Sequence, residues 1–130
     1  KNHPFSAAHA GESSIPEQLL RTELDGMSFI RSAKGSLSRR MEDAMFERIG
    51  FSPRTFCEVN DYITFINLVG ADLGFAFVSA DYASLSDKVS VWSMEPKLLR
   101  RNILLVRPGF ERGKEADYLI DRIKNYKLFK

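Results

Sequence analysis

Short apolar segments alternate with helix-forming segments along this chain, and this alternation constrains the fold more than any other feature of the sequence. The apolar runs at 27–30, 55–59 and 75–78 each have the length of a buried strand. The segments between them carry apolar residues at helical spacing. Strands that alternate with helices indicate an α/β fold, in which a mainly parallel sheet is flanked by helices.

Capping residues and glycines predict where two of these helices begin and end. Ser36 can cap the first helix, which is expected to stop at Gly50. Either Asn60 or Asp61 can cap the second helix, which is expected to stop at Gly74. The predicted buried stripes are Leu37, Met41, Ala44, Met45 and Ile49 in the first helix and Ile63, Ile66, Val69 and Leu73 in the second.

Weaker patterns predict the elements at the two ends of the chain. The first fourteen residues read as loop, and a short helix follows over 16–20 with Ser14 as its cap. Two more strands are predicted, an alternating one at 88–94 and a buried one at 103–106. A last helix is predicted from about 114 to 128, with Ala116, Leu119, Ile120 and Ile123 as its apolar stripe.

Composition excludes several classes of protein. The 130 residues are 44% apolar, which allows a core without metals or disulfides. The 19 basic and 17 acidic residues give a net charge of +2, which is too mild to predict nucleic-acid binding. No apolar run approaches the roughly 20 residues of a membrane helix, and no signal peptide is visible. Cys57 is the only cysteine, which favours a reducing compartment such as the cytoplasm.

No group of residues predicts catalysis or metal binding. His3 and His9 lie in the loop-like N-terminal stretch without a metal-ligand spacing, so both are expected to be solvated. Cys57 lacks an evident partner base and is expected to be a buried structural residue. We therefore predict no catalytic residue, no metal ion and no cofactor. Glu42, Asp43 and Glu47 are expected on a solvated helix face, where Arg39 and Arg40 can pair with them.

Two junctions between a strand and a helix are candidates for a ligand site. In open α/β sheets, ligands lie at the carboxyl ends of the strands, where helix N-termini also point. The junctions at 30–36 and 59–64 offer free N–H groups and positive helix-dipole ends, which favour a carboxylate-bearing metabolite. Gly35 would allow close approach and Lys34 would add charge, while Ser36, Asn60 and Thr64 could hydrogen-bond the ligand.

The same residues also have purely structural explanations. Ser36 and Asp61 stand where helix caps belong, and most caps have no other role. Gly35 can be an ordinary turn residue, and Lys34 can be a solvated loop lysine. Tyr62 can be a partly buried edge residue. The residues alone leave both interpretations open.

A series of motifs resembles the effector-binding domain of LysR-type transcriptional regulators. The segment 50–61 reads GFSPRTFCEVND, and with Thr64, 68–69 and 73–78 it is similar to the family's pattern in order and spacing. The N-terminal His3-Pro4-Phe5 is similar to the opening of the family's second lobe. Further similar pieces are 24–30, Leu105-Val106-Arg107 and the terminal helix.

Two departures from the family pattern bear on the pocket more than on the fold. Asp72 stands where the family usually has glycine. Ser79-Ala80 replaces a frequent proline after the strand.

The resemblance implies a fold like that of type 2 periplasmic binding proteins, in which two α/β lobes flank a cleft. Residues 1–100 would form the second lobe, and 101–130 would supply a crossover strand and a C-terminal helix that return to the first lobe. The first lobe and the N-terminal DNA-binding domain would be missing from this sequence.

The implied function is the sensing of a small anionic metabolite, without catalysis, by a cytoplasmic homo-oligomeric regulator, either a dimer or a tetramer. DNA would be contacted only through the missing N-terminal domain, and no membrane is involved. A solute-binding receptor of the same fold that serves a transporter, and an enzyme built on this fold, are the alternatives. The predicted effector-binding residues are Ser32, Lys34, Gly35, Ser36, Asn60, Asp61, Tyr62 and Thr64.

Overall fold

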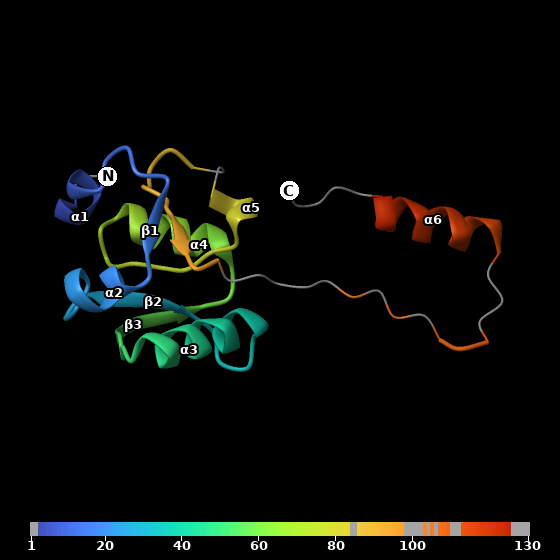
Figure 1. The fold of residues 1–130 in the computed structure, drawn as a ribbon, viewed down its shortest axis with the longest axis horizontal. Coiled ribbons are helices and arrows are strands. Elements are labelled where there is room, and N and C mark those ends of the chain that lie inside the picture. The colour runs from blue at the N-terminus through green and yellow to red at the C-terminus, as the bar shows by residue number, and fades with distance from the viewer. Residues whose placement is uncertain are drawn as a thin grey trace. The chain divides into compact units, whose positions relative to one another are not determined.

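The computed structural model of the chain describes residues 3–83, 86–97, 103, 105, 107–109 and 113–125. The chain divides into two compact units, Lys1–Leu98 and Leu99–Lys130. The elements of the first unit are α1 (Pro4–Ala8), β1 (Ser14–Pro16), α2 (Gln18–Glu23), β2 (Ser28–Ser32), α3 (Leu37–Ile49), β3 (Arg54–Val59), α4 (Tyr62–Gly70), α5 (Ala80–Ala83) and β4 (Ser93–Glu95) (Figure 1).

A parallel pair of strands, β2 and β3, forms the centre of the first unit. The pairing runs from Ser28 opposite Arg54 to Ser32 opposite Val59, with an irregularity after Phe29. Phe75 adds a parallel bridge to β2, in which its amide donates to the Ser28 carbonyl over 2.9 Å. The predicted α/β fold with parallel strands and flanking helices is confirmed, although the strand predicted at 75–78 is reduced to this bridge.

Asp72 and Gly74, which precede Phe75, have backbone conformations that bring Phe75 to β2. Gly74 has φ 154°, and a Cβ there would lie 2.4 Å from the Ser28 carbonyl oxygen. Any side chain at this position would therefore push Phe75 away from β2. Asp72 has φ 61°, a left-handed conformation that aspartate adopts more readily than most residues.

The helices α3 and α4 follow β2 and β3 and lie on opposite faces of the strand pair (Figure 1). The cap predicted at Ser36 is confirmed, and α3 ends at Gly50, which is left-handed with φ 65°. Of the two predicted caps for α4, Asp61 is the one used. The predicted end of α4 at Gly74 is wrong, because the helix stops at Gly70.

The predicted stripes are confirmed only in part, since Met45 of the α3 stripe is buried and Ile49 packs against the core. In α3 the buried residues are Glu42, Met45 and Phe46, whereas Leu37 is exposed. In α4 only Phe65 is buried, and Ile63 is 60% exposed. Apolar residues make up most of α4, so helical spacing alone does not determine which side faces the sheet.

The core of the first unit is an aromatic cluster built around Phe29 of β2. Its ring packs edge-on against Phe46 with centroids 5.2 Å apart, and Phe51 and Phe75 lie next to it. Phe5 of α1 continues the cluster to Trp92. Smaller apolar residues complete the buried set, namely Ile15, Leu20, Leu24 and Met45.

The N-terminal stretch is structured, so its prediction as loop is wrong. His3 caps α1 by accepting a hydrogen bond from the Phe5 amide at Nδ1. Ser14 is a strand residue of β1, which pairs in parallel with β4, and the following helix starts at Gln18. The strand predicted at 88–94 is correspondingly shorter and later, at 93–95. Two buried side chains, Phe5 and Ile15, anchor this stretch, and they are too sparse to give a periodic pattern.

The second unit contains α6 (Lys114–Asn125), which agrees with the start of the predicted helix; its predicted end at 128 lies outside the described residues. The predicted buried strand at 103–106 is not found at its two described positions, because Ile103 and Leu105 are 71% and 88% exposed and belong to no strand. In α6, Leu119 and Ile123 of the predicted stripe are also exposed. None of the described helices has both the length and the hydropathy that crossing a bilayer requires.

Candidate functional site

The two predicted junctions meet at the carboxyl ends of β2 and β3. The Ala33 amide donates to the Val59 carbonyl over 3.0 Å, so the segments that follow the two strands start side by side. All eight predicted effector-binding residues therefore lie on two adjacent segments, 32–36 and 60–64, which we call the carboxyl edge. The two junctions, which the sequence predicted as separate candidate sites, therefore lie in one region of the first unit.

The turn at 33–36 places the N-terminus of α3 at the carboxyl edge. The Ser36 amide donates to the Ala33 carbonyl over 3.2 Å, and Gly35 between them has φ 84°, which favours glycine. Ser36 Oγ accepts from the Arg39 amide, so this hydroxyl serves as the cap. The side chain of Lys34 is exposed. This cap takes up the Arg39 amide, whereas by helix geometry the amides of Leu37 and Ser38 have no partner within the helix and can donate to an anion.

Ser32 is buried, and its polar groups are bonded within the protein. Its amide and hydroxyl both donate to the Glu42 carboxylate, and its carbonyl accepts from Arg39 Nη1 over 3.1 Å. The environment of Ser32 therefore favours a structural role.

A buried ionic network, which the sequence did not predict, lies beneath the carboxyl edge. Glu42 is only 4% exposed and accepts from Arg31 Nε over 2.9 Å. Arg31 Nη2 also donates to Asp43 over 2.6 Å, and Phe46 covers the guanidinium. The expectation that Glu42 is solvated is wrong. Its spacing of three and four residues from Met45 and Phe46 was the available signal, because those positions share one helix face.

Arg39 and Glu58 link this network to the surface. Arg39 Nη1 donates to Glu58 over 2.8 Å and Arg39 Nε donates to Asp43 over 3.1 Å, the latter being the predicted helical pair. The other Glu58 oxygen accepts weakly from the Lys34 amide at 3.4 Å. The hydrogen bond from Arg39 lowers the pKa of Glu58. Burial disfavours the charged form of Asp43, but hydrogen bonds from Arg39 and Arg31 outweigh it and lower the pKa of that carboxyl.

The start of α4 has a different charge from the start of α3. The Asp61 carboxylate accepts from the Thr64 amide and from the Thr64 hydroxyl, each over 2.8 Å, and the amide bond is the main reason that the pKa of Asp61 is lowered. This helix start therefore already holds a negative charge. Asn60 beside it is exposed. The ring of Tyr62 stacks on Tyr82 of α5 with centroids 4.0 Å apart, which agrees with a partly buried position.

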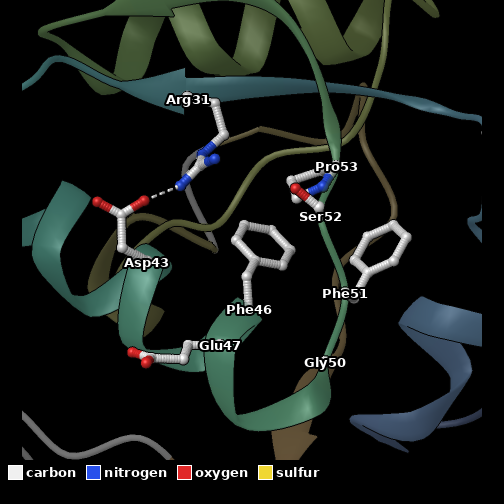
Figure 2. Close-up of a pocket in the computed structure, with 8 residues that line it drawn as sticks. All are labelled: Arg31, Asp43, Phe46, Glu47, Gly50, Phe51, Ser52 and Pro53. Carbon is white, nitrogen blue, oxygen red and sulfur yellow. Dashed lines mark hydrogen bonds and ion pairs between the residues drawn. The ribbon is translucent and has the colours of Figure 1, made fainter.

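A shallow depression of about 370 Å³ lies beside the C-terminal half of α3, away from the carboxyl edge. Figure 2 shows Arg31 and Asp43 meeting above the ring of Phe46, with Ser52 and Pro53 across the depression. None of the eight predicted residues lines it. Arg31 pairs with Asp43, and Glu47 adds a second acidic group to the lining, so the depression has no excess of positive charge for an anion.

Of the residues considered for catalysis, His9 contacts two carboxylates and Cys57 lies partly buried in β3. His9 is not solvated, because its two ring nitrogens contact Glu12 at 3.2 Å and Glu23 at 2.9 Å. The hydrogen bond with Glu23 is the main cause that raises the pKa of His9. Cys57, which was expected to be buried, is only partly buried and its thiol is free. Among the residues that the structure describes, no group of three or more His, Cys, Asp or Glu side chains could hold a metal ion.

Comparison with known proteins gives one match, to a protein family. The family described as "LysR substrate binding domain" matches residues 6–126, which is most of the chain. Neither the curated proteins nor the solved structures contain a significant match.

Proposed function

This chain belongs to the LysR substrate-binding domain family, whose members sense effectors and are not enzymes. We propose that the chain supplies the second lobe of a regulator's effector-binding domain. In this proposal residues 1–100 form that lobe, and 101–130 return to a first lobe across the cleft. The whole regulator would act in the cytoplasm. The solute-binding receptor that the sequence left open has no observation of its own in its favour.

We place the effector at the carboxyl edge, and one observation carries this assignment. The hydrogen bond from the Ala33 amide to the Val59 carbonyl brings the starts of α3 and α4 together. Two helix N-termini that converge beside a cleft can bind a small polar molecule from two sides. The residues proposed to contact it directly are Lys34, Gly35, Ser36, Asn60, Asp61, Tyr62 and Thr64, whereas Ser32 supports them from below.

The starts of α3 and α4 differ in charge, so we expect each of them to bind a different chemical group of the effector. The start of α3 has a neutral cap, Ser36, and the exposed Lys34 next to it, so it suits a carboxylate. The start of α4 has the ionised cap Asp61, which would repel an anion but could accept hydrogen bonds. A small metabolite with a carboxylate at one end and a hydroxyl or amine at the other fits this arrangement.

The proposed mechanism is a shift between two arrangements of the lobes. An effector moves that equilibrium only by the difference between its affinities for the two arrangements. Contacts made to both lobes at once supply such a difference. In a homo-oligomer, a dimer or a tetramer, the rearrangement would change how the DNA-binding domains are presented.

The test uses the regulator with both proposed lobes and starts from a panel of small carboxylates with their neutral amide analogues. Thermal-shift measurements should find a carboxylate that stabilises the protein while its amide does not, since only binding to the folded state raises the midpoint. Stabilisation by neither member of any pair would contradict an anionic effector.

Two substitutions at Ser36 then test the position of the carboxylate. Ser36→Asp keeps a good cap but adds a negative charge, whereas Ser36→Thr keeps a neutral cap. By calorimetry, the dissociation constant of the carboxylate should rise at least about tenfold with Asp, corresponding to roughly 1.4 kcal/mol, and should change little with Thr. Equal constants for the two variants would remove the start of α3 from the site.

A further inference from the structure

One arginine side chain joins three separate elements at the carboxyl edge. Arg39 Nη1 donates to the Ser32 carbonyl at the end of β2 and to the Glu58 carboxylate near the end of β3. Its Nε donates to Asp43 one turn further along α3. Its own amide donates to the Ser36 cap. A single residue therefore ties together the ends of both strands and the first turn of the helix.

Arg39 hydrogen-bonds two groups that adjoin the turn at 33–36, the Ser32 carbonyl and the Glu58 carboxylate. Glu58 uses one oxygen for Arg39 and the other for the Lys34 amide, so Arg39 orients the carboxylate that touches the turn. Ser32 immediately precedes the turn, and its carbonyl is held directly. The side chain of Arg39 is only 14% exposed, so water competes with these bonds less than at an open surface.

The next residue along α3 provides a comparison. Arg40 has the same side chain one position further along the same helix, yet it is exposed and its guanidinium has no hydrogen bond or ion pair with any described residue. The two arginines carry the same charge on the same helix, and the difference that matters here is in their contacts.

We propose that Arg39 is a positioning residue of the effector site, which holds the 33–36 turn in the geometry that presents the α3 amides to the ligand. This inference rests on the function proposed above, because it concerns the same site. Arg39 does not have to touch the effector to act in this way. Its effect passes through Ser32 and Glu58.

Amide hydrogen exchange by NMR on the labelled 130-residue chain tests the proposal, with Arg40→Gln as the matched control. In Arg39→Gln, the amides of Ala33 and Ser36 should exchange at least about fivefold faster, while the Ile30 amide, which donates to the Phe75 carbonyl, should not change. Arg40→Gln should leave all three amides unchanged. Arg39→Lys should be intermediate, because an ammonium can pair with Glu58 but cannot reproduce the guanidinium fork.

Two results would overturn the proposal. One is unchanged exchange at Ala33 and Ser36 in Arg39→Gln, and the other is an equal acceleration at Ile30, which would indicate general destabilisation. Titration of the same samples with inorganic sulfate, followed at the Ser36 amide, separates this inference from the proposed function. A local exchange effect without sulfate binding to the wild type would support the positioning role and count against an anionic effector.

Discussion

The most informative perturbation of this fold is the removal of the Glu42 carboxylate. It accepts hydrogen bonds from three donors, which are Arg31 Nε and the amide and hydroxyl of Ser32, and it is 4% exposed. In Glu42→Ala these donors lose their acceptor inside the protein, and the Arg31 charge keeps only Asp43. Breaking a buried ion pair from one side costs about 3–5 kcal/mol, so we expect a loss of roughly 4 kcal/mol.

Urea unfolding followed by fluorescence gives a direct measurement, because Trp92 is the only tryptophan and lies against the core of the first unit. Glu42→Gln should cost less, about 2 kcal/mol, since its amide oxygen can still accept from Ser32. The control is Glu47→Ala on the same helix, where an exposed side chain should change stability by less than about 0.5 kcal/mol.

The double variant Arg31→Met, Glu42→Leu tests the electrostatic part of the argument. With no charge left unpaired in the interior, it should be more stable than Glu42→Leu alone. A loss below about 1 kcal/mol in Glu42→Ala, or a double variant less stable than the single one, would refute the reasoning, because the cost would then not come from stranded buried groups.

Two further predictions concern the backbone at Gly74 and the imidazole of His9. Gly74→Ala should cost about 3 kcal/mol in urea unfolding because its Cβ would meet the Ser28 carbonyl at 2.4 Å. Gly35→Ala, which also has a positive φ (84°) but has open space around it, should cost about 1 kcal/mol, and similar losses in the two variants would disprove the close-contact argument. The hydrogen bond with Glu23 is the main cause that raises the pKa of His9 in the folded state. The contribution of His9 to the free energy of unfolding is therefore complete below its unfolded pKa and is lost as pH rises through its folded pKa. The difference in thermal midpoint between wild type and His9→Gln should therefore be larger at pH 5.5 than at pH 8, and a difference independent of pH would contradict it.

The order of β2, α3, β3 and α4 could be predicted because each of these elements carries its own local signal. The run at 27–30 around Phe29 is short and largely apolar. Ser36, Gly50 and Asp61 are residue types that are preferred at the ends of helices. The parallel pairing then followed from the alternation of elements. The family resemblance predicted from 50–61 was confirmed by the match over 6–126.

The features that the sequence did not predict depend on contacts between distant segments. Glu42 is charged and was expected in solvent, but Arg31 from the preceding strand makes its burial possible. The strand β1 is recognisable only from its partner β4, which lies at the far end of the first unit. The role of Arg39 likewise depends on Glu58, which no spacing rule within a helix connects to it.

The pairing of β1 with β4 has a consequence for how the first unit is made. Ser14 pairs with Ser93, so the loop that this small sheet closes contains most of the residues of the first unit. By contrast, β2 and β3 are joined by a single helix, α3. Contacts between segments that are close in the chain form at a lower entropic cost than contacts that close a long loop. During synthesis on the ribosome, the region of the carboxyl edge can therefore form while the chain is still growing. The N-terminal strand must wait for the segment around Met94 before it finds its partner.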